Sequence, residues 1–252
     1  MASSTTTDSG WTRRFRAAPQ ARARLICFPH AGGSATSCFP FAQALTPGTD
    51  VLAVQYPGRQ ERRSEPPLDS IELLTDALTR ELLPCADRPL VFFGHSMGAI
   101  IAYETALRFE AAGVPVAHLV ASGRRAPSRY RPETVHLRGD EGILAEVRLL
   151  RGTDSALLDD PEMQALILPA LRSDYHAIET YRHAPGLRLE RTPVTALTGD
   201  ADPRTTIDEA RSWSAHTTAA FDLRVLPGDH FFALSRPEAV VPVLAGLLGG
   251  LG

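Results

Sequence analysis

Lysine and asparagine are both absent from this chain of 252 residues, so all 26 of its basic residues are arginines. Without lysine the chain has no Schiff-base nucleophile and no phosphate-binding lysine of the P-loop type. Without asparagine it has no Cys-His-Asn triad and no acceptor for N-glycosylation. The net charge of −3 gives no indication of a nucleic-acid partner or of binding to an acidic membrane surface.

Cysteine is scarce, and long apolar runs are missing. The three cysteines form no CxxC pair, and their odd number argues against a disulfide framework, which fits a reducing cytoplasm. No apolar run approaches the roughly 18 residues that a membrane span needs, and residues 1–10 lack the apolar core of a signal peptide. We therefore expect a cytoplasmic protein that binds no membrane and has a disordered N-terminus over residues 1–10.

Short apolar runs alternate with helical patterns along most of the chain. The helical patterns cover residues 69–83, 99–112 and 237–248, and Asp69 with Glu72 resembles a capping box. Continuous apolar runs predict six strands covered on both faces, at residues 24–28, 50–56, 89–93, 117–121, 192–197 and 221–226. The alternation predicts an α/β fold with a mostly parallel central sheet flanked by helices.

Residues 125–187 interrupt this alternation. No strand pattern is evident there, and the two clearest helical patterns cover residues 140–150 and 162–181. A helical block between two strands indicates an inserted lid, so we expect the core to consist of residues 11–124 and 188–252. A long crossover connection without the function of a lid is the alternative interpretation.

The strongest chemical signal is the sequence Gly94-His95-Ser96-Met97-Gly98, which matches the nucleophile elbow G-x-S-x-G. A strand pattern precedes it and a helical pattern follows it, as the elbow requires. In such a turn the glycines allow close backbone contacts, and the serine stands at the N-terminus of the helix. Ser96 is therefore the expected nucleophile.

A serine hydroxyl needs a base, and the base needs an acid that holds its ring. His230 follows the last predicted strand, which places it at the same sheet edge as Ser96, whereas His216 falls in a helical pattern. Asp200 and Asp202 both follow the fifth predicted strand, and we expect Asp202 to be the acid and Asp200 to form a turn. The order of serine, acid and histidine along the chain is that of the α/β-hydrolase fold.

An oxyanion hole requires two backbone N–H donors near Ser96. The residue after the nucleophile, Met97, supplies one in this fold, and the loop after the first central strand supplies the other. That loop contains a Gly-Gly pair, which allows the backbone to approach a substrate closely, and we expect Ala31 to be its donor. His30 in the same loop is interpreted as a packing residue.

Several basic residues outside this set have weaker interpretations. The run Arg59–Arg63 is typical of a solvated loop. Arg124 and Arg125 follow a strand end, where they either border the pocket mouth or are plain surface residues. His176 and His183 are expected to be structural residues on a lid helix.

Five motifs of this chain occur together in a known family, in the order FPHAGG, YPGRQERR, GHSMG, TGDADP and GDHFF. Over residues 11–248 the chain resembles the type II thioesterases that accompany modular polyketide synthases and nonribosomal peptide synthetases. GHSMG alone is shared by many hydrolases, whereas HAGG, YPGR and GDHFF in one chain are considerably more specific.

The resemblance implies an editing enzyme that hydrolyses stalled or misprimed acyl groups from the phosphopantetheine arm of acyl or peptidyl carrier proteins. The family's site residues map onto five positions, the triad Ser96, Asp202 and His230 and the oxyanion donors Ala31 and Met97. The lid maps onto roughly residues 125–187. Because a thioester is already activated, acylation of the serine and then hydrolysis needs no metal ion or other cofactor. An acidic carrier protein would meet arginines, for which Arg59–Arg63 and Arg124–Arg131 are candidates.

Three other functions are compatible with the residues. A carboxylesterase or lipase would cleave small free esters and show no preference for carrier-bound substrate. An acyl transferase or cyclase would pass the acyl group to a hydroxyl or an amine. A binding protein that keeps the fold without activity would not be labelled by a fluorophosphonate at Ser96. The sequence does not indicate the acyl chain preference, and nothing in it demands more than a monomer.

Overall fold

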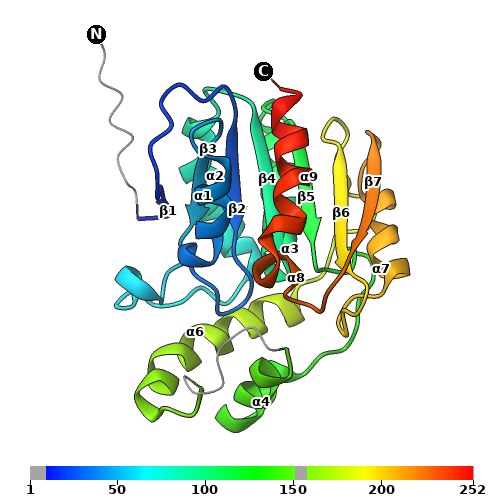
Figure 1. Ribbon diagram of the computed structural model, residues 1–252. Coiled ribbons are helices and arrows are strands. Elements are labelled where there is room, and N and C mark those ends of the chain that lie inside the picture. The colour runs from blue at the N-terminus through cyan, green and yellow to red at the C-terminus, as the bar shows by residue number, and fades with distance from the viewer. Residues whose placement is uncertain (1–9, 151–157, 252) are drawn as a thin grey trace.

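The computed structural model of the protein describes residues 10–150 and 158–251, so the expected disorder of residues 1–10 lies outside the described residues, except at Gly10. Seven strands form one sheet in the order β1-β3-β2-β4-β5-β6-β7 (Figure 1). All neighbouring strands are parallel except β1 with β3, which confirms the expected α/β architecture. The strands are β1 (Thr12–Arg13), β2 (Arg24–Phe28), β3 (Asp50–Val54), β4 (Leu90–His95), β5 (His118–Ser122), β6 (Val194–Gly199) and β7 (Phe221–Leu226).

The six predicted strands correspond to β2 through β7, with ends that agree to within two residues. The sequence pattern does not predict β1, because two residues paired to the edge of a sheet carry no apolar periodicity. The expectation that every strand is covered on both faces is wrong for β7. Its residues are partly buried or exposed, since β7 forms the other edge of the sheet.

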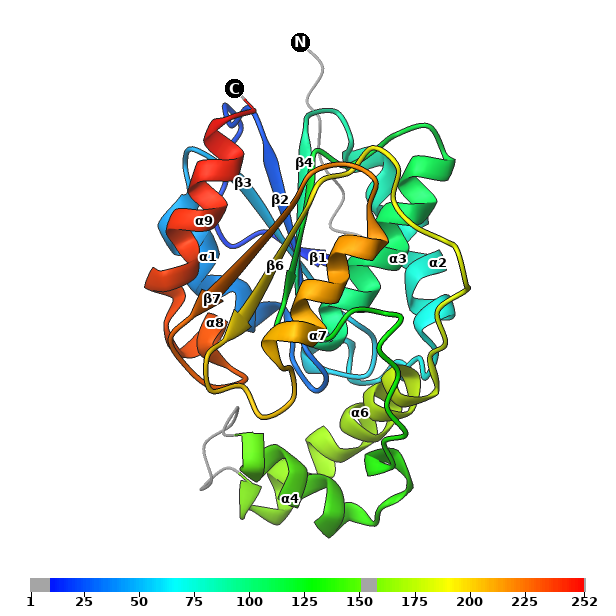
Figure 2. The ribbon, with the colours of Figure 1, turned by 90° about the vertical axis from the view of Figure 1, so that its right-hand side faces the viewer.

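Two layers of helices cover the sheet, which Figure 2 shows nearly edge-on between them. Each layer has its own apolar cluster, and the two clusters meet the sheet from opposite faces. One layer consists of α1 (Phe39–Leu45), α8 (Phe232–Ser235) and α9 (Pro237–Gly249). The other consists of α2 (Ile71–Leu82) and α3 (Met97–Ala111), with α7 (Ile207–Arg211) beside them. Within the described ranges, no helix is long and apolar enough to cross a membrane.

The predicted helices match α2, α3 and α9, but the start of α2 differs from the expectation. The N-cap of α2 is Ser70, whose hydroxyl accepts the backbone N–H of Leu73 at 3.4 Å. The expected capping box of Asp69 with Glu72 is therefore wrong, because the helix begins one residue later than that pairing requires.

The described part of residues 125–187 contains helical elements and no strand. A short 3-10 turn, Val135–Leu137, precedes α4 (Asp140–Leu150) and α6 (Pro161–Thr180). Both helices lie across one end of the sheet, at the lower end in Figure 1. They share a small apolar cluster of their own, separate from the two clusters of the core. His176 lies on α6, whereas His183 follows the end of α6, so its expected place on a helix is wrong.

Candidate active site

Ser96 lies in a sharp turn between β4, which ends at His95, and α3, which begins at Met97. Its backbone angles are φ 54° and ψ −117°, a conformation that residues other than glycine rarely adopt. Such strain persists only where the surrounding structure holds it. Here the N–H of Ser96 donates to the carbonyl oxygen of Ser122 at 2.8 Å, which ties the turn to the end of β5.

Close backbone contacts require both glycines of this turn. A Cβ atom on Gly94 would lie 2.1 Å from the carbonyl oxygen of Gly98. A Cβ atom on Gly98 would lie 2.0 Å from the carbonyl oxygen of Phe28 in β2. Because no side chain fits into either gap, glycine on each side of the serine is what allows β4 to turn directly into α3.

Ser96, His230 and Asp202 form one hydrogen-bonded series. Nε2 of His230 lies 3.1 Å from Oγ of Ser96, and Nδ1 lies 3.1 Å and 3.0 Å from the two carboxylate oxygens of Asp202. The carboxylate is fully buried and also accepts the backbone N–H groups of Arg204 at 2.8 Å and Thr205 at 3.3 Å. With Nδ1–H donated to Asp202, Nε2 is free to accept the proton of the serine hydroxyl.

The residues that compete with Asp202 and His230 in the sequence lie outside this series. The carboxylate of Asp200 accepts the N–H of Gly228 at 2.9 Å, so Asp200 forms a turn, as expected. His216 is buried, with Nε2 at 2.9 Å from the hydroxyl of Ser128 and Nδ1 at 3.3 Å from the hydroxyl of Tyr103. The structure therefore brings together the acid and the histidine that the sequence favours.

The loop after β2 turns back on itself at residues 30–33. The N–H of Gly33 donates to the carbonyl oxygen of His30 at 2.9 Å, and Gly32 has φ +75°, as the third residue of a type II turn must. In a trans peptide the C=O and the following N–H point in opposite directions. Because the carbonyl of His30 points into the turn, the N–H of Ala31 points out of it.

Ser96 and His230 line a pocket that is open to solvent, with about 580 Å³ of empty space when the solvent at its mouth is included. Ala31 and Met97 line the same pocket, so the expected oxyanion donors lie beside the nucleophile. Six charged side chains also line it: Arg124, Arg125, Glu133, Glu146, Glu179 and Arg204. This lining makes the pocket considerably more polar than a typical site for a small apolar ligand.

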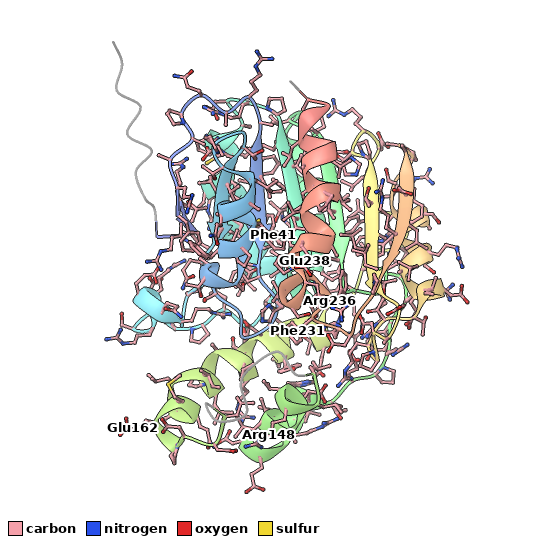
Figure 3. All side chains as sticks on the ribbon, viewed as in Figure 1. Phe41, Arg148, Glu162, Phe231, Arg236 and Glu238 are labelled. Atoms are coloured by element: carbon pink, nitrogen blue, oxygen red, sulfur yellow. The ribbon has the colours of Figure 1, made fainter. Side chains whose placement is uncertain are left out.

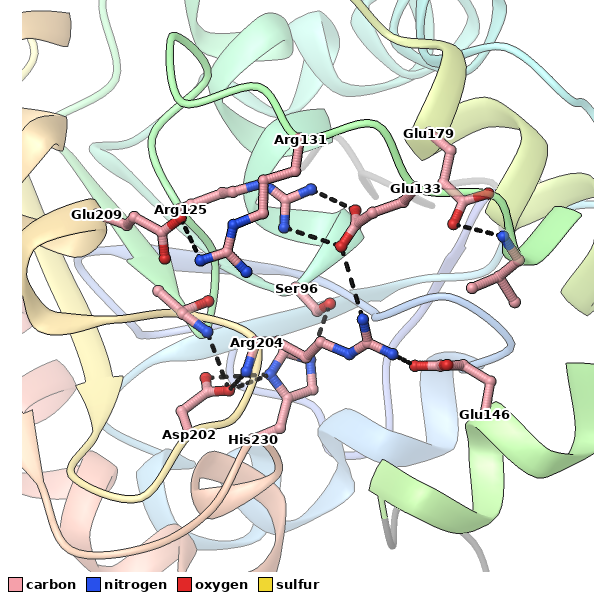
Figure 4. A network of polar contacts seen from close by, with 12 residues as sticks. Ser96, Arg125, Arg131, Glu133, Glu146, Glu179, Asp202, Arg204, Glu209 and His230 are labelled. Atoms are coloured by element: carbon pink, nitrogen blue, oxygen red, sulfur yellow. Dashed lines mark hydrogen bonds and ion pairs between the residues drawn. The ribbon is translucent and has the colours of Figure 1, made fainter.

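An ion-pair network lies over the hydrogen-bonded series (Figure 4). Arg204 follows Asp202 by two residues, and its guanidinium pairs with Glu133 at 3.6 Å and with Glu146 of α4. Arg125 also pairs with Glu133, with one N–O distance of 3.2 Å. Since Glu133 and Glu146 belong to residues 125–187, the network joins that segment to the loop that carries Asp202.

Two further histidines lie beside His230. The ring of His30 packs against Phe231, which Figure 3 labels at the end of the sheet nearest α6. Burial, helped by the nearby His230 and Arg59, lowers the pKa of His30 to about 3. Burial, with His230 and His30, also holds the pKa of His95 well below its usual range. Both rings are therefore neutral at pH 7, as a packing role for His30 requires.

Two arginines of the run Arg59–Arg63 are buried, so the interpretation of this run as a solvated loop is wrong for them. Arg59 makes a bidentate ion pair with Asp174 of α6, and Arg62 pairs with Glu65 at 2.5 Å. Sequence reasoning missed Asp174, although a signal exists. An acidic side chain stands there on the apolar face of a helix, where it is favourable only if it is paired.

No group of three or more histidine, cysteine, aspartate or glutamate side chains within residues 10–150 and 158–251 is arranged to hold a metal ion. The expectation that the reaction needs no metal and no other cofactor stays a prediction.

A mostly parallel sheet, a nucleophile elbow and a Ser–Asp–His order along the chain define a serine hydrolase of the α/β-hydrolase fold. A family model described as "Thioesterase domain" matches residues 23–246, and the chain belongs to this family. It is therefore a serine hydrolase that acts on thioester bonds.

Several known proteins are similar over nearly the whole chain. Thioesterase PikA5 of Streptomyces venezuelae is 49% identical over 228 residues, which cover 89% of this chain and 81% of that protein. The structure of BorB, a type II thioesterase from the borrelidin biosynthetic cluster, shares 50% identity with a TM-score of 0.88 and covers 94% of this chain and 97% of its own. RedJ, a thioesterase of the prodiginine pathway in Streptomyces coelicolor, shares 36% identity with a TM-score of 0.81. The match covers 91% of this chain and 86% of the RedJ chain. The resemblance to type II thioesterases is confirmed.

Proposed function

We propose that this enzyme hydrolyses acyl groups from the phosphopantetheine arm of carrier proteins in a polyketide or nonribosomal peptide pathway, and so removes stalled or aberrant chains. The observation that carries the proposal is the series Ser96, His230, Asp202 at a nucleophile elbow, with an N–H donor loop beside it. The names of two similar structures support the choice of substrate: YbtT is a type II thioesterase from the yersiniabactin NRPS/PKS pathway, and ClbQ comes from the colibactin NRPS/PKS pathway.

In the first step Ser96 attacks the carbonyl carbon of the thioester. Nε2 of His230 takes the proton from Oγ as the new C–O bond forms, and Asp202 stabilises the resulting imidazolium. The N–H groups of Ala31 and Met97 donate to the oxyanion of the tetrahedral intermediate. The intermediate then collapses, the C–S bond breaks, and the sulfur leaves as a thiol with the proton from His230.

In the second step water hydrolyses the acyl-serine. His230 accepts a proton from the water molecule as its oxygen attacks the same carbonyl carbon. The ester C–O bond breaks, Oγ of Ser96 recovers the proton, and the carboxylic acid leaves. Water is the only reactant besides the thioester, and no electron acceptor enters either step, so the residues named account for the whole cycle.

We assign residues 125–187 the role of a lid that shapes the acyl pocket and admits the long pantetheine arm. The polar lining of the pocket and the ion pairs of Arg204 to Glu133 and Glu146 support this role. Of the two candidate surfaces for the carrier protein, we propose the one in Arg124–Arg131, at the exposed Arg129 and the nearby Arg131. Arg59–Arg63 is a poor candidate, since Arg59 lies inside the protein. We further propose that the enzyme acts as a monomer in the cytoplasm.

The test uses a phosphopantetheinyl carrier protein loaded with a series of short acyl groups. Release is followed by intact mass and compared with hydrolysis of the same acyl group on pantetheine alone and in a simple ester. Faster release from the carrier than from either control supports the proposal. A carrier that stays loaded while the ester is cleaved means that the enzyme is a carboxylesterase, and transfer to an added amine or alcohol means that it is an acyl transferase.

A further inference from the structure

A buried ion pair joins the helix α6 to the loop after β3, which carries Arg59. The guanidinium of Arg59 donates to both carboxylate oxygens of Asp174, at 2.7 Å and 2.9 Å. The side chains are 7% and 0% exposed, and the two residues are 115 positions apart in the chain. The pair therefore fixes a long-range contact between residues 125–187 and the core.

Both members of the pair also bind the backbone of the turn at residues 30–33. Oδ2 of Asp174 accepts the N–H of Gly32 at 2.7 Å, and Nη1 of Arg59 donates to the carbonyl oxygen of Gly33 at 3.0 Å. One helical turn before Asp174, Leu171 contacts the turn so closely that a Cβ on Gly32 would lie 2.4 Å from its Cδ2. The face of α6 is thus seated directly on this turn.

These contacts determine the direction of the Ala31 N–H. The peptide between His30 and Ala31 is fixed by the hydrogen bond from Gly33, and the next peptide is fixed by Asp174. With both of these peptide planes held, the Ala31 N–H has one orientation, out of the turn, and Ala31 is a residue that lines the pocket. Preorganised orientation of this kind is what makes an oxyanion donor effective.

Stability does not account for such a pair. Removing two charges from water is costly, and a buried ion pair is often no more stabilising than apolar side chains of the same volume. What apolar side chains cannot supply is an acceptor for Gly32 N–H and a donor for Gly33 C=O. The hydrogen bonds to the turn are therefore the contribution specific to Arg59 and Asp174.

We propose that Asp174, held by Arg59, is a positioning residue that aligns the Ala31 N–H for the oxyanion, so that the hole is complete only while α6 is seated on the core. This inference rests on the proposed function, in which Ala31 is an oxyanion donor. The same helix contributes Tyr175, Ile178 and Glu179 to the pocket. One helix therefore builds part of the substrate site and completes the catalytic backbone geometry.

The experiment measures kcat and KM for a short acyl-N-acetylcysteamine thioester with three proteins. These are the native enzyme, Asp174→Leu, which has no acceptor for the N–H of Gly32, and the double variant Arg59→Met/Asp174→Leu. The double variant guards against misfolding, because it removes the ion pair without leaving one buried charge alone. Loss of an oxyanion donor lowers kcat by about 100- to 1000-fold, so a misaligned donor is expected to lower kcat by about 10- to 100-fold, with KM within about threefold.

A second readout separates positioning from general damage to the fold. A trifluoromethyl ketone that forms a tetrahedral adduct with Ser96 should bind the variants more weakly by the factor lost in kcat/KM, whereas the matching acyl amide should bind unchanged. Asp50→Leu is the matched control. Asp50 is also a buried acid, 2% exposed, and it pairs with Arg24 at the opposite end of the sheet. This control should lose stability but keep kcat per folded molecule.

The inference is wrong if Asp174→Leu and the double variant keep the native kcat per folded molecule. It is also wrong if ketone and amide binding weaken by the same factor. The thioester used here has no carrier protein, so the result does not depend on carrier recognition. Failure of the native enzyme to unload a carrier would refute the proposed function and leave the role of Asp174 standing.

Discussion

Replacement of Asp202 by asparagine should invert the proton arrangement of His230. Oδ1 of Asp202 accepts two backbone N–H groups, from Arg204 and Thr205, while Oδ2 lies 3.0 Å from Nδ1 of the histidine. An asparagine keeps its oxygen on the two backbone donors and places its NH₂ group against Nδ1. Nδ1 then becomes an acceptor, and Nε2 carries the proton and points it at Ser96. A base that is already protonated cannot accept the serine proton.

The expected loss in kcat is about 10⁴-fold, which corresponds to about 5 kcal/mol of transition-state stabilisation. The assay follows loss of the acyl group from the carrier protein in a single turnover with enzyme in excess, because this loss is the acylation step and does not depend on product release. Asp200→Asn is the control, since Asp200 lies in the same loop but its carboxylate accepts only the N–H of Gly228 among the residues described. A variant at Asp202 that stays within tenfold of the native rate would refute the proposed role of this carboxylate.

Three further results are expected from the geometry. Gly98→Ala should fail to accumulate as folded protein, because its Cβ would lie 2.0 Å from the carbonyl oxygen of Phe28; soluble, native-like protein by circular dichroism would contradict this. Stability should fall as the pH drops below about 6.5, because the folded protein holds His30 neutral with a pKa of about 3 while the unfolded chain takes up the proton. This costs about 1–2 kcal/mol by pH 5, and urea titrations of His30→Gln should show a smaller pH dependence than the native protein. Arg148→Ala should change the free energy of unfolding by less than about 1 kcal/mol, because the ion pair of Arg148 with Asp159 is exposed; a larger loss would give that pair a structural role.

The elements that the sequence predicts well are those with local causes. The elbow around Ser96 follows from two glycines between a strand pattern and a helical pattern, and the structure has that turn. Asp202 and His230 are found because the chain order of this fold restricts where an acid and a base can stand. Strand ends agree to within two residues, because buried parallel strands are short continuous apolar runs.

The features that the sequence pattern does not predict depend on residues that lie far away in the chain. The charged run around Arg59 is typical of a solvated loop. Arg59 is buried because it pairs with Asp174, which lies 115 residues later in the chain. The two-residue strand β1 exists only because β3 offers it a free edge. The start of α2 differs by one residue, since Ser70 and Asp69 are both competent N-caps and local sequence does not decide between them.

The acyl-serine intermediate is tested directly by mixing the enzyme with acylated carrier protein, quenching within milliseconds, and mapping the acyl group by peptide mass spectrometry. We expect an acyl group on Ser96 that appears before the free acid and is absent from Ser96→Ala, which leaves the carrier loaded. An acyl group on another residue, or undiminished release by Ser96→Ala, would contradict the acyl-serine mechanism.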